Sequence, residues 1–151
     1  MQNNVWLLTN GLGSFSMGSV DESICHSDYA LFTALLRPPL RREKCVRRMY
    51  ETVYLDNRWQ PLIAANKHAG ASCFRAKFSL VNNLPCYEYT NDQIILNKRL
   101  FMEPGADALY FQYEVVRSEA KCRLRIQPLL TLPESFFETN FIDSPLHVME
   151  N

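Results

Sequence analysis

Hydrophobic and polar positions alternate along most of this chain, and a period of two is typical of β-strands. In the segment FRAKFSL, Phe74, Ala76 and Phe78 share one face, and Arg75 and Lys77 share the other. Segments 46–56, 94–102, 108–116 and 121–130 follow the same rule and are rich in aromatic and β-branched residues. We therefore expect an all-β protein, an antiparallel β-sandwich.

Two of these segments carry charges at notable positions. In 94–102 Lys98 interrupts the apolar face, because by alternation it lies on the same face as Ile94, Leu96, Leu100 and Met102. In 121–130 the alternation predicts an inward face and an outward face, with Cys122, Leu124 and Ile126 inward and Arg123 and Arg125 outward.

Turn residues separate the predicted strands, at 55–57, 81–85, 89–92 and 103–107. Segment 27–36 fits either a short helix or a buried strand, and the all-β surroundings favour a strand. At most one short helix is expected. After residue 130 the alternation fades and prolines recur, so we expect a sandwich domain over 1–130 and a divergent tail over 131–151.

Composition and charge exclude several partners. Sixteen basic residues balance sixteen acidic ones, and this predicts no nucleic-acid or membrane partner. The basic run 37–48 is expected to be a solvated turn flanking a strand. The five cysteines form no C-x-x-C pair, and no signal peptide is visible. Reduced, mostly buried thiols in a cytoplasmic protein, with no metal and no cofactor, are the simplest interpretation.

The segment TNGLGSFSMGS, residues 9–19, holds three of the five glycines of the chain. Ser16 stands where a dinucleotide fingerprint needs its third glycine, and Ser19 stands where a phosphate loop needs lysine. We therefore expect a tight turn between two strands, with Gly11 or Gly13 at positive φ.

The segment VWLLTNGLGSFSMGSV, followed by RPP, resembles the start of the bacterial and archaeal glycogen debranching enzymes of the amylo-alpha-1,6-glucosidase type. The residues of the family-motif turn are Thr9, Asn10, Gly11, Gly13 and Gly18. YETV at 50–53 and LNKRLFMEPGADALYFQYEV at 96–115 also look like family segments. The resemblance runs from about residue 6 to about residue 130.

This resemblance implies an N-terminal β-sandwich, supersandwich-like and incomplete in this chain. In the family, hydrolysis occurs in a following (α/α)6 barrel, so the resemblance implies a non-catalytic domain that packs on such a barrel. The chain differs from the family at CHSDYA (25–30), where T-R-R-Y-H-G is usual, and at TLPESFF (131–137), where Y-R-D-x-H is frequent.

Three alternatives to this role are considered: catalysis, binding of α-glucan, and no remaining function. Catalysis would need two carboxylates flanking a sugar-sized cleft, such as Glu51 with Asp56 or Glu88 with Asp92, and we expect none of these pairs to be catalytic. A triad of His26, Ser27 and Asp28 is unfavourable because residues so close in sequence rarely aim at one point.

A stand-alone α-glucan-binding module would use exposed aromatic rings, and the candidates are Trp59, Tyr87 and Tyr89. A non-functional remnant of the enzyme is the last alternative. Exposed strand edges would favour self-association or pairing with a separate catalytic barrel chain.

Overall fold

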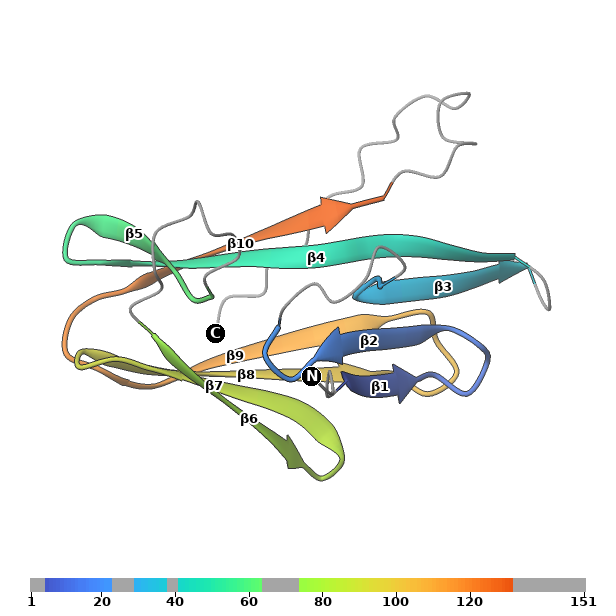
Figure 1. The fold of residues 1–151 in the computed structure, drawn as a ribbon, viewed down its shortest axis with the longest axis horizontal. Coiled ribbons are helices and arrows are strands. Elements are labelled where there is room, and N and C mark those ends of the chain that lie inside the picture. The colour runs from blue at the N-terminus through green and yellow to red at the C-terminus, as the bar shows by residue number, and fades with distance from the viewer. Residues whose placement is uncertain (1–4, 23–28, 38–40, 64–73, 132–151) are drawn as a thin grey trace.

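The computed structural model describes residues 5–22, 29–37, 41–63 and 74–131, and these form two antiparallel sheets that face each other (Figure 1). Within these ranges there are ten strands and no helix. The predicted all-β sandwich is confirmed.

Sheet A has the strand order β1-β2-β3-β4-β10, and β5 also pairs with β4. Its strands are β1 (Val5–Thr9), β2 (Phe15–Ser19), β3 (Phe32–Arg37), β4 (Arg41–Leu55), β5 (Arg58–Pro61) and β10 (Arg123–Leu130). Sheet B has the order β6-β7-β8-β9, with β6 (Arg75–Val81), β7 (Leu84–Thr90), β8 (Ile94–Met102) and β9 (Leu109–Ser118).

Sheet A is strongly curved between β2 and β3, where a single residue pair, Phe15 with Thr33, connects the strands. In Figure 1, β3, β4 and β10 form the upper layer, whereas β1 and β2 lie lower, toward sheet B. This curvature brings β1 into contact with β8. One end of the interior is therefore covered by the first hairpin of the chain.

Short polar turns connect the strands, as the sequence predicted. Asp56 and Asn57 have φ of 50° and 59°, and Asn82 and Asn83 have 53° and 62°. Asparagine and aspartate tolerate this left-handed conformation, and two such residues in a row give the tight turn that matches the twist of a hairpin.

The main core lies between the sheets. Its buried residues come from both layers and are Trp6, Val53, Leu55, Leu62, Phe74, Tyr87, Tyr89, Ile94, Leu96 and Leu100. A smaller cluster of Phe32, Ala34 and Met102 lies under the curved part of sheet A. The apolar face predicted for segment 94–102 is thus the centre of the sandwich.

The flank between the edge strands β9 and β10 is open. Val115 lies opposite Leu96 on β8, and Ile126 lies opposite Glu51 on β4, so both face inward. They are nevertheless 48% and 41% exposed. Along this side the described residues do not close the interior.

Segment 27–36 is a strand from Phe32 onward, as favoured, and residues 27–28 lie outside the described ranges. Cys45, Cys86 and Cys122 are free and half-buried, whereas the other two cysteines are outside these ranges. The proposed tail also lies outside them from residue 132, so the domain boundary remains a prediction. In the described part of the chain, no helix is long and apolar enough to cross a membrane.

Candidate functional site

Asn10 organises the first turn of the chain and ties it to a distant turn. Its side-chain oxygen accepts hydrogen bonds from the backbone N–H of Leu12 (2.9 Å) and of Ser14 (3.1 Å). Its amide nitrogen donates to Asp107 Oδ1 (2.9 Å) and to the carbonyl of Ala106 (3.1 Å). Asn10 is only 3% exposed, so these bonds meet its full hydrogen-bonding capacity inside the protein.

The neighbouring Ser14 extends this network. Its hydroxyl donates to Asp107 Oδ1 (2.5 Å) and accepts from the backbone N–H of Leu35 (2.8 Å). The backbone N–H of Gly105 also donates to the carbonyl of Asn10 (2.8 Å). The turn therefore holds β1–β2, β3 and the β8–β9 connection together. Because the amides of Leu12 and Ser14 bond within the turn, they are not available to hold a phosphate.

Two glycines of this segment are required by geometry. Gly13 has φ of 110°, and a Cβ there would lie 2.6 Å from the Leu35 side chain. Gly18 lies opposite Trp6, and a Cβ at this position would meet the indole ring at 2.5 Å. The Trp6 ring thus packs closely against β2 only because Gly18 has no side chain. The expected positive φ is confirmed at Gly13 and also at Gly11, whose φ is 80°.

Lys98 is the centre of a buried ionic cluster between the sheets. Its Nζ lies 2.6 Å from Glu22 Oε1 and 2.7 Å from Glu51 Oε1. The Tyr113 hydroxyl donates to Glu51 Oε1 (2.6 Å), and the Tyr89 hydroxyl donates to Glu22. The three charged side chains are between 0% and 12% exposed. We call these five residues the Lys98 cluster.

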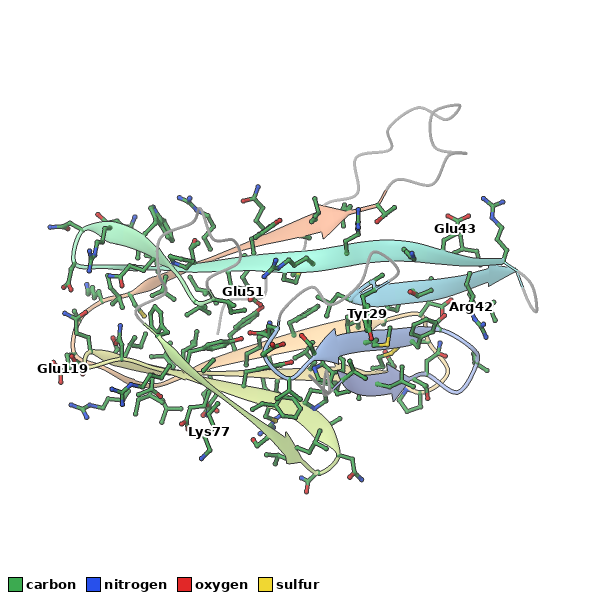
Figure 2. All side chains as sticks on the ribbon, in the orientation of Figure 1. Tyr29, Arg42, Glu43, Glu51, Lys77 and Glu119 are labelled. Carbon is green, nitrogen blue, oxygen red and sulfur yellow. The ribbon has the colours of Figure 1, made fainter. Side chains whose placement is uncertain are left out.

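Figure 2 shows Glu51 reaching from β4 into the space between the two layers. Glu51 follows the same inward alternation as Val53 and Leu55, which places a carboxylate on an otherwise apolar face. Glu22 comes from the residues after β2 and has φ of 53°. One oxygen of Glu51, Oε2, has no hydrogen-bond partner among the described residues.

The protonation states follow from burial and charge. Burial raises the pKa of Glu22 above its ordinary value, and the nearby Lys98 charge opposes this only in part. Burial lowers the pKa of Lys98, but the two carboxylates more than compensate and raise it overall, so the amine stays protonated. Burial, followed by the charge of a neighbouring glutamate, also raises the pKa of Tyr89 and of Tyr113. Both hydroxyls therefore remain neutral donors.

A small cavity adjoins the Lys98 cluster beside the first hairpin. Its volume is about 70 Å³, and its lining includes Trp6, Glu22, Tyr87 and Lys98. This is room for several water molecules. Tyr87 closes one wall, since its hydroxyl accepts a hydrogen bond from Trp6 Nε1 (2.5 Å) and donates to the carbonyl of Ser19 (2.8 Å).

The three aromatic residues predicted to stack on sugars lie in different environments. Tyr87 and Tyr89 are 2% and 0% exposed, so their ring faces are packed in the core. Trp59 is 38% exposed, but the guanidinium carbon of Arg125 lies 3.8 Å from its ring centroid. The structure does not bring the three rings together on one surface, because period-two alternation places the β7 pair inward.

The carboxylate pairs considered for catalysis do not converge either. Glu51 is buried, whereas Asp56 is an exposed turn residue bonded to Gln93 (2.7 Å). Glu88 is exposed on the outer face of sheet B, and Asp92 is exposed in the β7–β8 turn. Residues 26–28 of the triad considered above lie outside the described ranges. Among the described residues, no group of three or more His, Cys, Asp or Glu could hold a metal ion.

Sequence reasoning missed Glu22 and Tyr113. Lys98 on an apolar face was the available signal, because a buried lysine needs a carboxylate partner. The identity of that partner was not readable from a pattern, since Glu22 is 76 positions away in the chain.

Comparison with known proteins places the chain in a family. The family described as "Glycogen debranching enzyme N terminal" matches residues 4–134, which is most of the sequence. No curated protein and no solved structure matches. The matched region contains the Asn10 turn, Gly18 with Trp6, and all ten strands. The chain therefore belongs to the family of glycogen debranching enzyme N-terminal domains.

Proposed function

We propose that this chain is a non-catalytic β-sandwich that supports an α-1,6-glucosidase barrel by packing on it. The Lys98 cluster is the observation that carries the proposal. Glu22 and Glu51 are held within 2.7 Å of the same amine, and tyrosine hydroxyls bond to them as well. A glycosidase needs its two carboxylates on either side of the scissile bond in an open cleft. Glu22 and Glu51 instead share one counter-ion, Lys98, inside the sandwich.

The Lys98 cluster has a structural role in this proposal. It joins β4 of sheet A to β8 and β9 of sheet B through charges that have little contact with water. Buried ionic groups of this kind fix how two layers meet, because any other arrangement leaves a charge unpaired. The result is a rigid platform, which suits a domain that supports another one.

Formation of a complex tests this proposal. The purified chain is mixed with the (α/α)6 barrel of a bacterial glycogen debranching enzyme that lacks its own N-terminal domain, and the mixture is analysed by sedimentation velocity. We expect a species with the mass of one chain plus one barrel. Separate sedimentation of the two proteins at concentrations of about 10 μM would contradict the proposal, because such a partner contact is expected to bind at least this tightly.

An α-glucan-binding module is the second candidate, and one observation favours it. The outer face of sheet B has a hollow of about 210 Å³ lined by polar side chains that include Asn97, Arg99, Gln112 and Glu114. None of these four side chains has a hydrogen bond or ion pair in the described structure. Figure 2 shows Lys77, which belongs to the same outer face, pointing away from the sandwich.

Electrophoresis in gels that contain glycogen tests this second candidate. Retardation of the wild-type chain that is lost in Gln112→Ala would support binding at the hollow. Retardation lost in Trp59→Ala but kept in Gln112→Ala would instead assign glucan binding to the aromatic residue on sheet A. Unretarded migration of the wild-type chain would contradict this candidate.

A further inference from the structure

The outer face of sheet A around β5, β4 and β10 carries an unusual set of side chains. Residues that lie directly opposite each other on neighbouring strands share a face. Arg123 and Trp59 both lie opposite Tyr54, Arg125 lies opposite Thr52, Gln127 opposite Tyr50, and Leu129 opposite Arg48. We call these nine residues the arginine–aromatic face.

This face is positively charged; its β5 and β10 side chains are exposed, and its β4 side chains are half-buried. It has three arginines and no aspartate or glutamate, although the whole chain carries equal numbers of basic and acidic residues. Arg123 and Arg125 are exposed and have no carboxylate partner in the described structure. Arg123 and Arg125 therefore make this face complementary to a partner that carries carboxylates.

Two of the three arginines are held in place by aromatic rings. The guanidinium of Arg125 lies over the Trp59 ring at 3.8 Å, and that of Arg48 lies over the Tyr50 ring at 5.4 Å. Tyr54 packs against Trp59 with ring centroids 5.2 Å apart. A guanidinium stacked on a ring keeps its N–H donors free at its edge, in a fixed orientation that matches a carboxylate. Tryptophan, tyrosine and arginine are also the residues that dominate binding energy in protein interfaces.

We propose that the arginine–aromatic face is the docking surface for an acidic patch on the catalytic barrel. This inference rests on the proposed function and names the part of the chain that performs it. The central contact is a carboxylate of the barrel bound by Arg125 beside the partly exposed Trp59. Leu129, which is 40% exposed, supplies apolar contact at the end of β10.

The face does not suit other occupants as well. A symmetric contact with a second copy would place arginine against arginine. A nucleic acid needs ring faces open for stacking, and Arg125 occupies one face of Trp59. Pro128 lies on the edge strand β10 and has no N–H to donate, so docking through side chains on the face is favoured over addition of another strand.

The test measures the affinity of the chain for the separately expressed barrel by isothermal titration. The wild-type chain is compared with Arg125→Glu, Trp59→Ala and a matched control, Arg75→Glu, which places the same charge change on the outer face of sheet B, away from the hollow. Far-UV circular dichroism checks that each variant is folded. We expect Arg125→Glu and Trp59→Ala to weaken binding about 30-fold or more, and Arg75→Glu to bind like the wild type. Wild-type binding should also weaken as salt is raised from 50 to 300 mM, because the contact is ionic.

The other outcomes separate the two proposals. If all three variants bind the barrel as tightly as the wild type, the docking face is wrong and the proposed function stands. If the wild-type chain does not bind the barrel, the proposed function fails, and the docking face fails with it. If the wild-type chain binds a single-stranded RNA dodecamer more tightly than the barrel, and Arg125→Glu abolishes that binding, the face is a nucleic-acid site and this inference is overturned.

Discussion

At the residue scale, a lysine at an apolar position explains how the two sheets are joined. Lys98 alternates inward with Leu96 and Leu100, and only its contacts with Glu22 and Glu51 make this position acceptable. Removal of one member of such a cluster is more harmful than removal of all its charges, because a buried charge is then left without a partner.

Replacement of the lysine tests this account. Lys98→Met leaves two carboxylates facing each other, and we expect it to lower the free energy of unfolding by about 3 to 5 kcal/mol. The triple variant Lys98→Met, Glu22→Gln, Glu51→Gln removes all three charges and should be more stable than the single variant. Urea denaturation measures both. A single variant as stable as the wild type would show that the cluster does not stabilise the fold.

The raised pKa of Glu22 predicts a pH dependence. An acid whose pKa is higher in the folded state binds more protons there, so its contribution to stability falls as pH rises through that pKa. We expect the stability of the wild-type chain relative to Glu22→Gln to decrease between pH 4 and pH 8. The raised pKa of Lys98 gives a contribution that persists through neutral pH and is lost only in strongly alkaline solution. A relative stability that increases from pH 4 to pH 8 would contradict the direction assigned to Glu22.

At the scale of elements, the Asn10 turn connects strands that are distant in the sequence. Asn10 reaches residues almost 100 positions away, at the β8–β9 connection. The glycines of the turn allow the backbone to fold around this side chain. The Asn10 turn therefore links the first hairpin to sheet B through hydrogen bonds.

The variant Asn10→Asp distinguishes the role of the Asn10 side-chain oxygen, which accepts hydrogen bonds, from that of its nitrogen, which donates them. Asn10→Asp keeps the oxygen that accepts from Leu12 and Ser14 but replaces the donor to Asp107 with a negative oxygen. We expect a loss of about 2 to 4 kcal/mol in the free energy of unfolding, because a buried charge then faces a carboxylate. Asn97→Ala, on the outer face of sheet B, is the control and should change it by less than about 0.5 kcal/mol. Equal stability of the two variants would show that the hydrogen bonds from Asn10 to the β8–β9 connection do not stabilise the fold.

Much of the fold could be predicted because alternation is a local property. The inward residues of β8 and the turns at Asp56 and Asn82 follow directly from period two and from turn chemistry. The pairing of Glu22 with Lys98 and of Asn10 with Asp107 could not be predicted, because no local pattern records which distant side chain meets a buried polar group. The burial of Tyr87 and Tyr89 could have been predicted, because both lie at alternate positions of β7 that share the inward face.

At the scale of the whole molecule, the outer face of sheet A and the β9–β10 flank both expose large hydrophobic side chains in the described structure. The arginine–aromatic face exposes Trp59, and the β9–β10 flank exposes Val115 and Ile126. Exposed apolar surface of this kind is typical of a domain that contacts another one. This agrees with membership in the family described as "Glycogen debranching enzyme N terminal".

The rate of glucose release from a branched limit dextrin tests the proposed function most directly. It is measured for the chain alone, for the separately expressed barrel alone, and for the barrel with increasing amounts of the chain. We predict no release by the chain alone, and a barrel activity that rises and reaches a plateau at one equivalent of chain. Glucose release by the chain alone, or a barrel activity that does not change as the chain is added, would contradict the account.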